Sequence, residues 1–204
     1  MSFLAHAAEP EYLDGSAKAT FVKSWEKSRS TLPEPLTSFV GRQSETDSVI
    51  RLLRRQDVRL VTFTGPGGIG KTRLAVETAR QIGPAFRDGV RFVSLEALTD
   101  PDLVITAVAR AIGVATSTEN VETSLHEEIA DRHLLLVVDN LEQVVSAAPV
   151  LSRILQAGPD VKLLATSRVP LRITAEQVFE IPPLALPAVV DRGNDESVMN
   201  AEAV

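Results

Sequence analysis

The clearest pattern along this chain is an alternation of short apolar runs with longer amphipathic segments. Five runs rich in branched and aromatic side chains have the length of buried strands: 59–65, 90–95, 133–139, 161–167 and 177–184. Apolar residues at helical spacing predict one helix before the first run and four among the runs: 44–56, 70–82, 101–112, 121–131 and 142–157. Ser44, with Asp47 three residues later, is the expected N-cap of the first helix. Strands that alternate with helices imply right-handed crossovers and a parallel sheet covered on both faces, so the predicted fold class is α/β.

The two ends of the chain carry weaker patterns. Residues 1–30 have few apolar positions and predict a tail or linker. Pro33 and Pro35 favour extended backbone, which places a boundary near residue 31. We expect one domain over residues 31–187. Residues 188–204 predict a linker followed by the first residues of a further helix.

Composition narrows the classes of protein that this chain can represent. Apolar residues make up 44% and charged residues 24% of its 204 positions, close to the average of globular proteins that fold in water. No apolar run reaches the roughly 18 residues that a membrane span needs. The N-terminus lacks the basic and apolar regions of a secretory signal, so a cytoplasmic location is expected. The absence of cysteine excludes disulfides and thiolate-bound zinc, and the three histidines show no metal-ligand spacing.

The charge balance argues against nucleic acid as the main partner of this segment. The formal net charge is −6, whereas phosphate backbones call for clustered positive charge. One basic cluster stands in and after the first predicted helix: Arg51, Arg54, Arg55 and Arg59. Acidic residues on the same helix favour a solvated helix face over a DNA contact. We therefore predict no direct nucleic-acid binding by these residues.

One motif carries specific chemistry. Directly after the first predicted strand, eight residues match the phosphate-binding pattern GxxxxGK[ST]: Gly65, Pro66, Gly67, Gly68, Ile69, Gly70, Lys71 and Thr72. The glycines let backbone N–H groups turn toward phosphates, and the next helix adds partial positive charge at its N-terminus. Lys71 is expected to reach the β- and γ-phosphates and Thr72 to bind magnesium, with Arg73 part of the same nucleotide-binding segment. The alternative, an ordinary glycine-rich turn, is disfavoured by the strand before the motif and the helix after it.

A second acidic element follows the third predicted strand. The apolar residues 134–138 lead into Asp139, where P-loop proteins place a carboxylate that organises magnesium. Asp139 is predicted to hold Mg²⁺ through water; a turn aspartate after a plain strand is the alternative. Asn140 stands where efficient ATPases often have a second acid, and an amide cannot accept a proton from the attacking water. Glu142 is the nearest candidate catalytic base, although an acid in the first turn of a helix would look the same.

A further candidate follows the fourth predicted strand. Residues 165–168, ATSR, should emerge at the carboxyl edge of the sheet, where ligands bind in open α/β folds. Arg168 is therefore predicted to sense the γ-phosphate. A solvated arginine after a strand is the alternative.

Several phrases together resemble one family: LTSFVGR (36–42), LVTFTGPGGIGKTRLA (60–75), DGVRFVSLEALTDPDLV (88–104), HLLLVVDNLEQVVSAAPVLSRIL (133–155), KLLATSRVPLRI (162–173) and IPPLALP (181–187). They resemble the NB-ARC-like ATPase domain of STAND proteins, the signal-transduction ATPases with numerous domains, in the branch found in bacterial transcriptional regulators of LuxR and AfsR type. The resemblance implies a P-loop NTPase with five parallel strands in the order 5-1-4-3-2. It also implies that ATP or ADP binds with Mg²⁺ and that four residues contact the adenine: Phe39, Val40, Gly41 and Arg42. Gln43 departs from the glutamate that usually follows the arginine.

The resemblance implies a regulatory switch with slow or no hydrolysis in isolation, whose nucleotide state controls a transcriptional or other signalling output. Such regulators continue into a helical lid, a winged helix and effector modules, so we expect this chain to be part of a longer protein that could oligomerise. Two alternatives stay open. A stand-alone P-loop phosphotransferase or ATPase enzyme would need a second substrate-binding segment, which we do not find. An interaction domain without nucleotide is disfavoured by the intact phosphate-binding motif.

Overall fold

The computed structural model describes residues 30–34, 37, 39, 41–116 and 120–182. Five parallel strands form one sheet: β1 (Leu60–Thr64), β2 (Val90–Ser94), β3 (Leu135–Asp139), β4 (Lys162–Thr166) and β5 (Glu176–Glu180). Their order is β2-β3-β4-β1-β5, which is the predicted order followed from the opposite edge. The predicted fold is therefore confirmed. Apart from Ser30, the predicted tail and the predicted linker at 188–204 lie outside the described residues.

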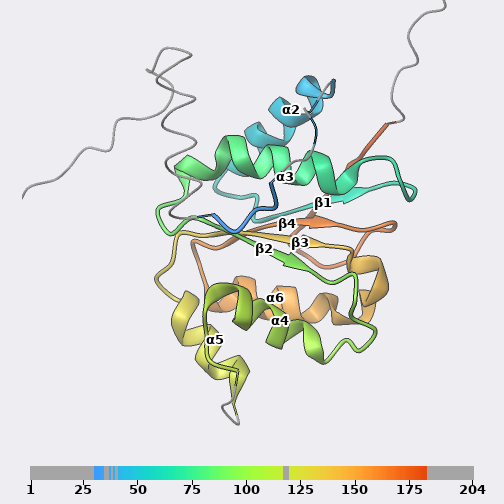
Figure 1. The fold of residues 1–204 in the computed structure, drawn as a ribbon. Coiled ribbons are helices and arrows are strands. Elements are labelled where there is room, and N and C mark those ends of the chain that lie inside the picture. The colour runs from blue at the N-terminus through green and yellow to red at the C-terminus, as the bar shows by residue number, and fades with distance from the viewer. Residues whose placement is uncertain (1–29, 35–36, 38, 40, 117–119, 183–204) are drawn as a thin grey trace, which may run out of the picture.

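Helices cover both faces of the sheet (Figure 1). On one face lie α2 (Gln43–Arg54) and α3 (Lys71–Ile82), and on the other lie α4 (Leu103–Ile112), α5 (Val121–Ile129) and α6 (Ala148–Ala157). Three short 3-10 turns complete the described elements: η2 (Gly83–Ala85), η3 (Leu141–Gln143) and η4 (Val145–Ala147). Among these helices none is long and apolar enough to cross a membrane.

Strand β3 shows how one sequence run builds two cores. Leu135 and Val137 pack with the apolar side chains of α2 and α3, while Leu136 and Val138 pack with those of α4, α5 and α6. All four are fully buried because successive strand residues point to opposite faces of the sheet. Burying each such side chain stabilises the fold by roughly 1.5–3 kcal/mol before entropy is counted. A charge at any of the four positions would therefore disrupt one of the cores.

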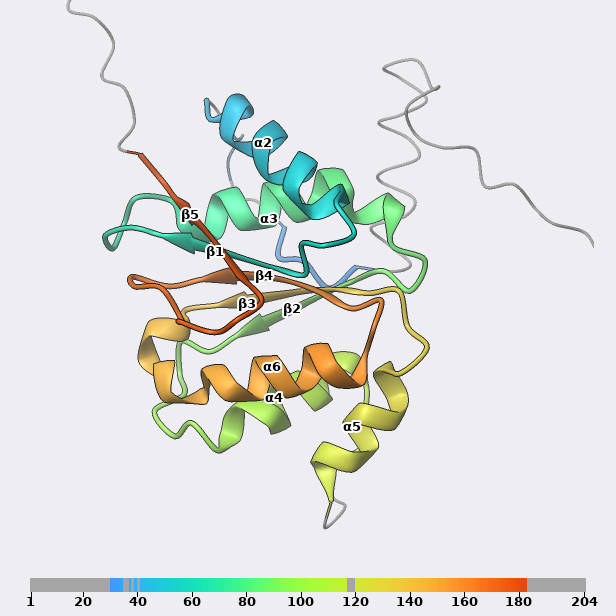
Figure 2. The same ribbon diagram turned by 180° about the vertical axis from the view of Figure 1, so that it is seen from behind.

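The two edges of the sheet are finished differently. At one edge β5 pairs with β1, from Leu60 opposite Glu176 to Thr64 opposite Glu180, and the view from behind in Figure 2 shows the two strands together. At the other edge the N-terminal segment touches β2, where Ser30 forms a parallel bridge to Val90. The incoming chain thus adds to the β2 edge before it reaches α2.

The predicted helix over 142–157 is wrong for its first turns. The chain forms the two 3-10 turns η3 and η4 there, and α6 begins only at Ala148. Asn140 has a left-handed backbone with φ +64°, and Val144 at φ −138° interrupts any continuous helix. Pro149 lacks the N–H that a helix interior needs, so a helix can start beside it but cannot run through it.

The predicted N-cap of the first helix is also wrong. Helix α2 begins at Gln43, and its N-cap is Arg42 with φ +61° and no capping side-chain hydrogen bond. The Ser44 hydroxyl instead donates to the carboxylate of Glu45 at 2.7 Å. The cap lies two residues earlier than predicted because the left-handed turn at Gly41 and Arg42 sets the start of the helix.

Candidate functional site

The loop between β1 and α3 has the features of an anion site. Gly68 and Gly70 have φ of +77° and +94°, a backbone conformation that side chains with a Cβ adopt only under strain. Helix α3 begins at Lys71 with no side-chain N-cap bond and no acidic residue in its first turn. Its first N–H groups and its positive dipole end are therefore not compensated by the protein's own side chains. This is the arrangement that binds phosphate at helix N-termini.

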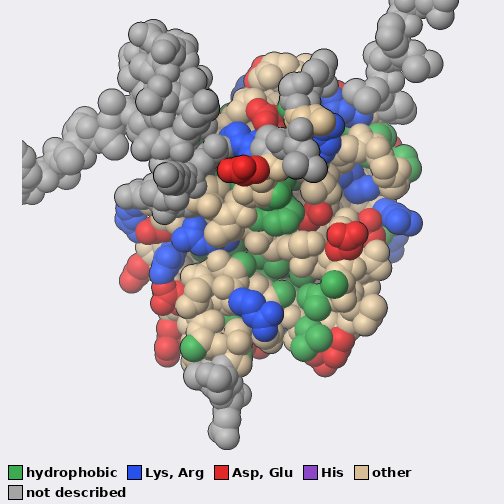
Figure 3. Space-filling model, viewed as in Figure 1, with side chains coloured by type: hydrophobic (Ala, Val, Ile, Leu, Met, Phe, Trp, Pro, Cys, Tyr) green, Lys and Arg blue, Asp and Glu red, His purple; other side chains and the backbone are tan. Residues whose placement is uncertain are grey.

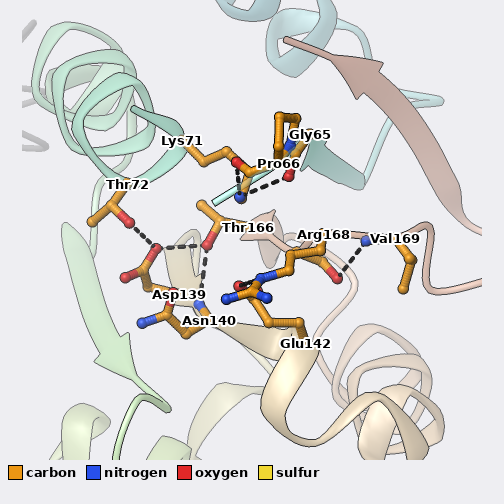
Figure 4. A network of polar contacts seen from close by, with 11 residues as sticks. Gly65, Pro66, Lys71, Thr72, Asp139, Asn140, Glu142, Thr166, Arg168 and Val169 are labelled. Carbon is orange, nitrogen blue, oxygen red and sulfur yellow. Dashed lines mark hydrogen bonds and ion pairs between the residues drawn. The ribbon is translucent and has the colours of Figure 1, made fainter. Parts of the chain in front are cut away.

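Lys71 supplies the positive charge of this loop. Its side chain is buried, with the residue 7% exposed, and its Nζ donates to the carbonyl oxygens of Gly65 at 2.8 Å and Pro66 at 3.0 Å. Figure 4 shows the ammonium turned into the loop. The two acceptors are neutral, so they solvate the ammonium without neutralising its charge. A bound anion would complete the site electrostatically.

Thr72 and Asp139 meet at the carboxyl edge of β3. The Thr72 hydroxyl donates to Asp139 Oδ1 at 2.7 Å, although the two residues are 67 positions apart. Because the Thr72 hydroxyl donates this hydrogen bond, the lone pairs of its oxygen remain available for a cation. The predicted metal-binding pair is thus brought together.

Thr166, at the end of β4, joins the same group. Its hydroxyl donates to Asp139 Oδ1 at 2.6 Å and accepts the backbone N–H of Asn140 at 3.0 Å. Figure 4 shows the resulting chain of contacts from α3 through β3 to β4. Asp139 is 4% exposed, and burying a polar group costs free energy unless it is hydrogen-bonded, so the two hydroxyl donors stabilise it here.

Glu142 and Arg168 form an ion pair beside this group. Arg168 Nε lies 3.3 Å from Glu142 Oε1, and the two side chains are 61% and 13% exposed. The guanidinium of Arg168 also lies next to the phosphate-binding loop, because a Cβ added to Gly67 would stand 3.7 Å from its Nη2. The other oxygen of Glu142, Oε2, is buried and has no hydrogen-bond partner in the structure. The candidate base is therefore held by the candidate sensor.

A segment that precedes α2 lies against the outer side of α3. Arg73 donates to the carbonyl and the hydroxyl of Thr37, and Arg80 donates to the carbonyl of Pro33. Between this segment and the helix lies a cavity of about 270 Å³. Its described lining combines three apolar residues, Pro33, Phe39 and Val76, with six polar or charged ones, several of them from the start of α3: Glu34, Thr37, Thr72, Arg73, Glu77 and Arg80. A ligand at the phosphate loop could thus extend along α3 beneath the segment.

Arg42 ties the end of this segment to the phosphate loop. Its Nη2 donates to the carbonyl of Ile69 at 3.2 Å, and its Nη1 lies 3.7 Å from Glu45 Oε1. The hydrogen bond from Ser44, together with the nearby Arg42 guanidinium, holds the pKa of Glu45 below its ordinary value. Among the predicted adenine contacts, Phe39 lines the cavity, exposed Gly41 precedes the tie, and Val40 lies outside the described residues.

In the basic cluster Arg51, Arg54 and Arg55 are exposed, while Arg59 is half-buried. Arg55 pairs with Asp57 at 2.6 Å, Arg51 contacts the hydroxyl of Ser48, and Arg59 donates to backbone carbonyls near the end of α6. On the face shown in Figure 3, basic side chains are interspersed with acidic ones. The absence of direct nucleic-acid binding stays a prediction.

Sequence reasoning missed two of the residues that the fold brings to this site. Thr166 lies in the phrase that pointed to Arg168, and its place at a strand end was a usable signal. Thr37 contacts Arg73 across 36 positions, and no local sequence pattern predicts that contact. Both omissions concern partners that meet only in the folded chain.

The residues present fit a nucleotide with a divalent cation. Uncapped helix N–H groups and the buried ammonium of Lys71 suit phosphates. The Thr72 hydroxyl and the Asp139 carboxylate offer oxygen atoms, the ligands that Mg²⁺ prefers beside phosphate oxygens. The chain can therefore supply both halves of a P-loop nucleotide site.

Comparisons with known proteins find similar sequences in bacteria. An uncharacterized protein of Mycobacterium tuberculosis is 38% identical over 154 residues, which are 74% of this chain and 38% of that protein. The regulatory protein AfsR of Streptomyces griseus is 30% identical over 150 residues, which are 68% of this chain and 15% of AfsR. Among solved structures, Cdc6p from Pyrobaculum aerophilum is 20% identical over 70% of this chain and 42% of its own, with a TM-score of 0.44.

The family of the chain is shown by a family model that matches more than half of it. The chain spans well under half of the length of the curated relatives above. A candidate HTH-type transcriptional regulator of Mycobacterium tuberculosis is also similar, at 37% identity over 63% of this chain and 14% of that protein. The sequence model described as an AAA domain matches residues 54–171, more than half of the chain and the stretch that holds β1 to β4. The chain therefore belongs to the AAA-domain family of P-loop ATPases.

Proposed function

We propose that this chain is the ATP- and ADP-binding switch domain of a signal-transduction ATPase of the STAND class, with an NB-ARC-like site, acting within a transcriptional regulator. The observation that carries the proposal is the joint placement of Lys71, Thr72 and Asp139 at one end of the sheet. In this role the nucleotide state shifts the domain between two arrangements against neighbouring modules. That shift can be no larger than the difference in nucleotide affinity between the two arrangements.

The phosphate end of the site is assigned to the loop and Lys71. The backbone N–H groups after Gly68 bind phosphate oxygens, and Lys71 turns from its two loop carbonyls toward the β- and γ-phosphates. Exchange of a neutral acceptor for an anionic one strengthens each hydrogen bond of the ammonium. The free energy of this exchange favours nucleotide binding.

The metal end is assigned to Thr72 and Asp139. Magnesium bound with the nucleotide would neutralise phosphate charge. The Thr72 oxygen would bind the ion directly, while Asp139, which accepts a hydrogen bond from the Thr72 hydroxyl, would bind it through water. Neither side chain has to move far, because the 2.7 Å hydrogen bond already sets their relative position.

Slow hydrolysis is proposed from the neighbours of Asp139. Asn140 cannot act as a base, and the carboxylate of Glu142 is paired with Arg168 at 3.3 Å. The same pairing keeps Arg168 beside Gly67, from where it can contact the γ-phosphate of ATP and not ADP. The site thus favours holding a nucleotide over turning it over.

The nucleoside end is assigned to the cavity along α3. Phe39 supplies an apolar wall, and the Arg42 tie to Ile69 fixes the distance between this wall and the phosphate loop. We propose that the adenine contacts the segment from Phe39 to Arg42, with Arg73 at the junction of base and phosphates.

The proposed output rests on the relatives. AfsR is named a regulatory protein, and another relative is named for HTH-type transcriptional regulation. This chain corresponds to 14–15% of those proteins, so the effector and lid modules would lie elsewhere in a longer protein. The winged helix, the oligomeric assembly and the cytoplasmic location of that protein belong to the proposal.

The test measures binding and turnover on the same 204-residue chain. We expect calorimetry to show binding of both ATP and ADP with magnesium, and steady-state phosphate release to stay well below roughly 1 s⁻¹, the lower end of ordinary enzymes. Glu142→Gln should lower the residual rate if Glu142 is the base, while Glu127→Gln on the exposed side of α5 is the matched control. No binding would refute the nucleotide assignment. Turnover above that limit would favour a stand-alone ATPase or phosphotransferase instead.

A further inference from the structure

Thr166 is a fully buried hydroxyl at the last position of β4, beside the proposed metal site. Its Oγ1 lies 2.6 Å from Asp139 Oδ1 and 3.0 Å from the backbone nitrogen of Asn140 (Figure 4). The strand around it is anchored on both sides: Phe63 of β1 lies opposite Thr166, and Val138 of β3 lies opposite Ala165. The hydroxyl is therefore held by the sheet and not by a loop.

The direction of each hydrogen bond follows from what each group can do. A backbone N–H only donates, so Thr166 must accept from Asn140. The one proton of the Thr166 hydroxyl is then directed to Asp139, whose ionised carboxylate only accepts. The Thr72 hydroxyl donates a hydrogen bond to the same oxygen, Oδ1, and no contact drawn in Figure 4 uses the other oxygen, Oδ2. Two donors from opposite sides thus fix the plane of the carboxylate.

We propose that Thr166 is a positioning residue: by holding Oδ1 of Asp139, it presents Oδ2 to the hydrated magnesium of a bound nucleotide. The inference rests on the proposed function, and Thr166 itself touches neither metal nor phosphate. Thr72 cannot do this alone, because its oxygen has to serve the cation and it sits on α3, which the nucleotide contacts directly. Hydrogen-bonded groups behind metal ligands typically account for about 10–100-fold in metal affinity.

The chain offers a closely matched control. Thr62, in the neighbouring strand β1, is also fully buried, and its hydroxyl has no hydrogen-bond partner. It lies opposite Ala165, one position before Thr166. Replacing threonine by valine at either position exchanges a hydroxyl for a methyl group of similar size. At Thr62 this removes no bond, whereas at Thr166 it removes one donor and one acceptor.

The experiment compares Thr166→Val, Thr166→Ser and Thr62→Val with wild type in the full chain. The first readout needs no ligand: hydrogen exchange of the Asn140 amide should accelerate by about tenfold or more in Thr166→Val. The second is ATP affinity by calorimetry with magnesium and with EDTA. Thr166→Val should lose about 10–100-fold of the gain that magnesium gives, with metal-free affinity near wild type. Thr166→Ser keeps the hydroxyl and should give wild-type values in both readouts, and Thr62→Val should change neither.

Each other outcome overturns the inference. An unchanged magnesium gain in Thr166→Val would show that Asp139 orients itself without Thr166. Equal losses with magnesium and with EDTA would show a general structural role. A wild-type chain that binds no ATP would refute the proposed function and this inference with it, whereas normal wild-type binding beside an unaffected variant refutes the inference alone. Thr166→Ala provides the same comparison should Thr166→Val not fold.

Discussion

Two lysines at opposite ends of the sheet show how one side chain serves two purposes. Lys71 follows the carboxyl end of β1, whereas Lys162 is the first residue of β4 and so lies at the amino end of the parallel strands. Both direct their ammonium to backbone carbonyls: Lys71 to two in the glycine loop, and Lys162 to three at and after the end of α2. The environments of the two ammonium groups nevertheless differ in charge.

The difference lies in which end of a helix each lysine faces. The carbonyls around Lys162, those of Leu53, Arg55 and Val58, belong to a helix C-terminus and the turn after it, where negative partial charge favours a cation. Three acceptors also use all three N–H groups of the ammonium. Lys71 stands at a helix N-terminus, where positive partial charge disfavours a cation until an anion joins it. Burial and the nearby Arg59 lower the pKa of Lys162, but every N–H group of its ammonium has an acceptor within the fold. Lys71 has two such acceptors, which leaves one N–H group for a ligand.

The largest expected effect comes from exchanging these two lysines for methionine, which keeps the stem and removes the charge. Lys71→Met should lower ATP affinity by about 100-fold or more, because hydrogen bonds to charged groups contribute roughly 1.5–3 kcal/mol each. Its melting temperature should stay near that of wild type. Lys162→Met should do the reverse: lose roughly 2 kcal/mol of unfolding free energy, or about 4–8 °C in melting temperature, and keep its ATP affinity.

Calorimetry and thermal unfolding of both variants test this reciprocity. Each variant is the control for the other, since the substitution is identical and only its position, at the carboxyl or the amino end of the strands, differs. The comparison fails if Lys71→Met binds ATP within a few-fold of wild type, or if Lys162→Met weakens binding as strongly as Lys71→Met.

The next largest effect on stability is expected from two glycines, Gly68 after the carboxyl end of β1 and Gly158 before the amino end of β4. The two positions require glycine for different reasons. Gly158 has an ordinary φ of −113°, but an added Cβ would stand 2.5 Å from Val161 Cγ2 and 3.0 Å from the carbonyl of Ile129. Gly158→Ala should therefore cost about 2 kcal/mol through overpacking. Gly68 has open space and φ +77°, so Gly68→Ala should cost roughly 1 kcal/mol through backbone strain.

Asparagine distinguishes the two causes. It tolerates the left-handed backbone better than alanine but is larger. Asn should thus be less destabilising than Ala at position 68 and more destabilising at position 158, measured as the free energy of unfolding in urea. The same ranking at both positions would contradict the distinction between conformation and space.

The smallest expected effect is a pH dependence of stability that comes from Asp88, just before the amino end of β2. Although partial burial of Asp88 would raise its pKa, the N–H of His133 at 2.8 Å and the Arg87 side chain at 3.2 Å lower the pKa below its ordinary value. The folded state therefore favours the charged carboxylate. Its stabilisation is present above a pH of about 4 and is lost as the pH falls through the lowered folded pKa.

Asp88→Asn should consequently be less stable than wild type at pH 7 by roughly 1 kcal/mol or less, since water screens a partly exposed group. The gap should close as the pH approaches about 2, well below the ordinary carboxyl value. Urea unfolding over this range measures it, with Asp131→Asn, an exposed carboxylate nearby, as the control. A gap that does not change with pH would assign the effect to lost packing.

Much of the architecture could be predicted from the sequence because its signals are local. Four of the five predicted runs contain an observed strand, and the fifth, 177–184, overlaps β5, which begins one residue earlier at Glu176. The runs of β1 and β3 are apolar because these strands are buried throughout, whereas β5 is an edge strand with half-buried and exposed residues. The loop before α3 also has a local signal. Gly68 and Gly70 could be recognised in the sequence because left-handed backbone favours glycine. The break before α6 was not predicted, because the helical spacing of apolar residues continues through Val144. The backbone nevertheless leaves the helical conformation at Asn140 and again at Val144.

The sequence by itself predicted a phosphate- and magnesium-binding loop, because the eight residues from Gly65 to Thr72 form one contiguous motif. Only the tertiary structure decided which partners control them. Thr166 reaches Asp139 across 27 positions, and Glu142 reaches Arg168 across 26. Both contacts exist because parallel pairing of β3 with β4 places two strand ends side by side. The physical reason is that strand register, which brings distant polar groups within hydrogen-bonding distance, is set by the packing of the whole sheet and not by neighbours along the chain.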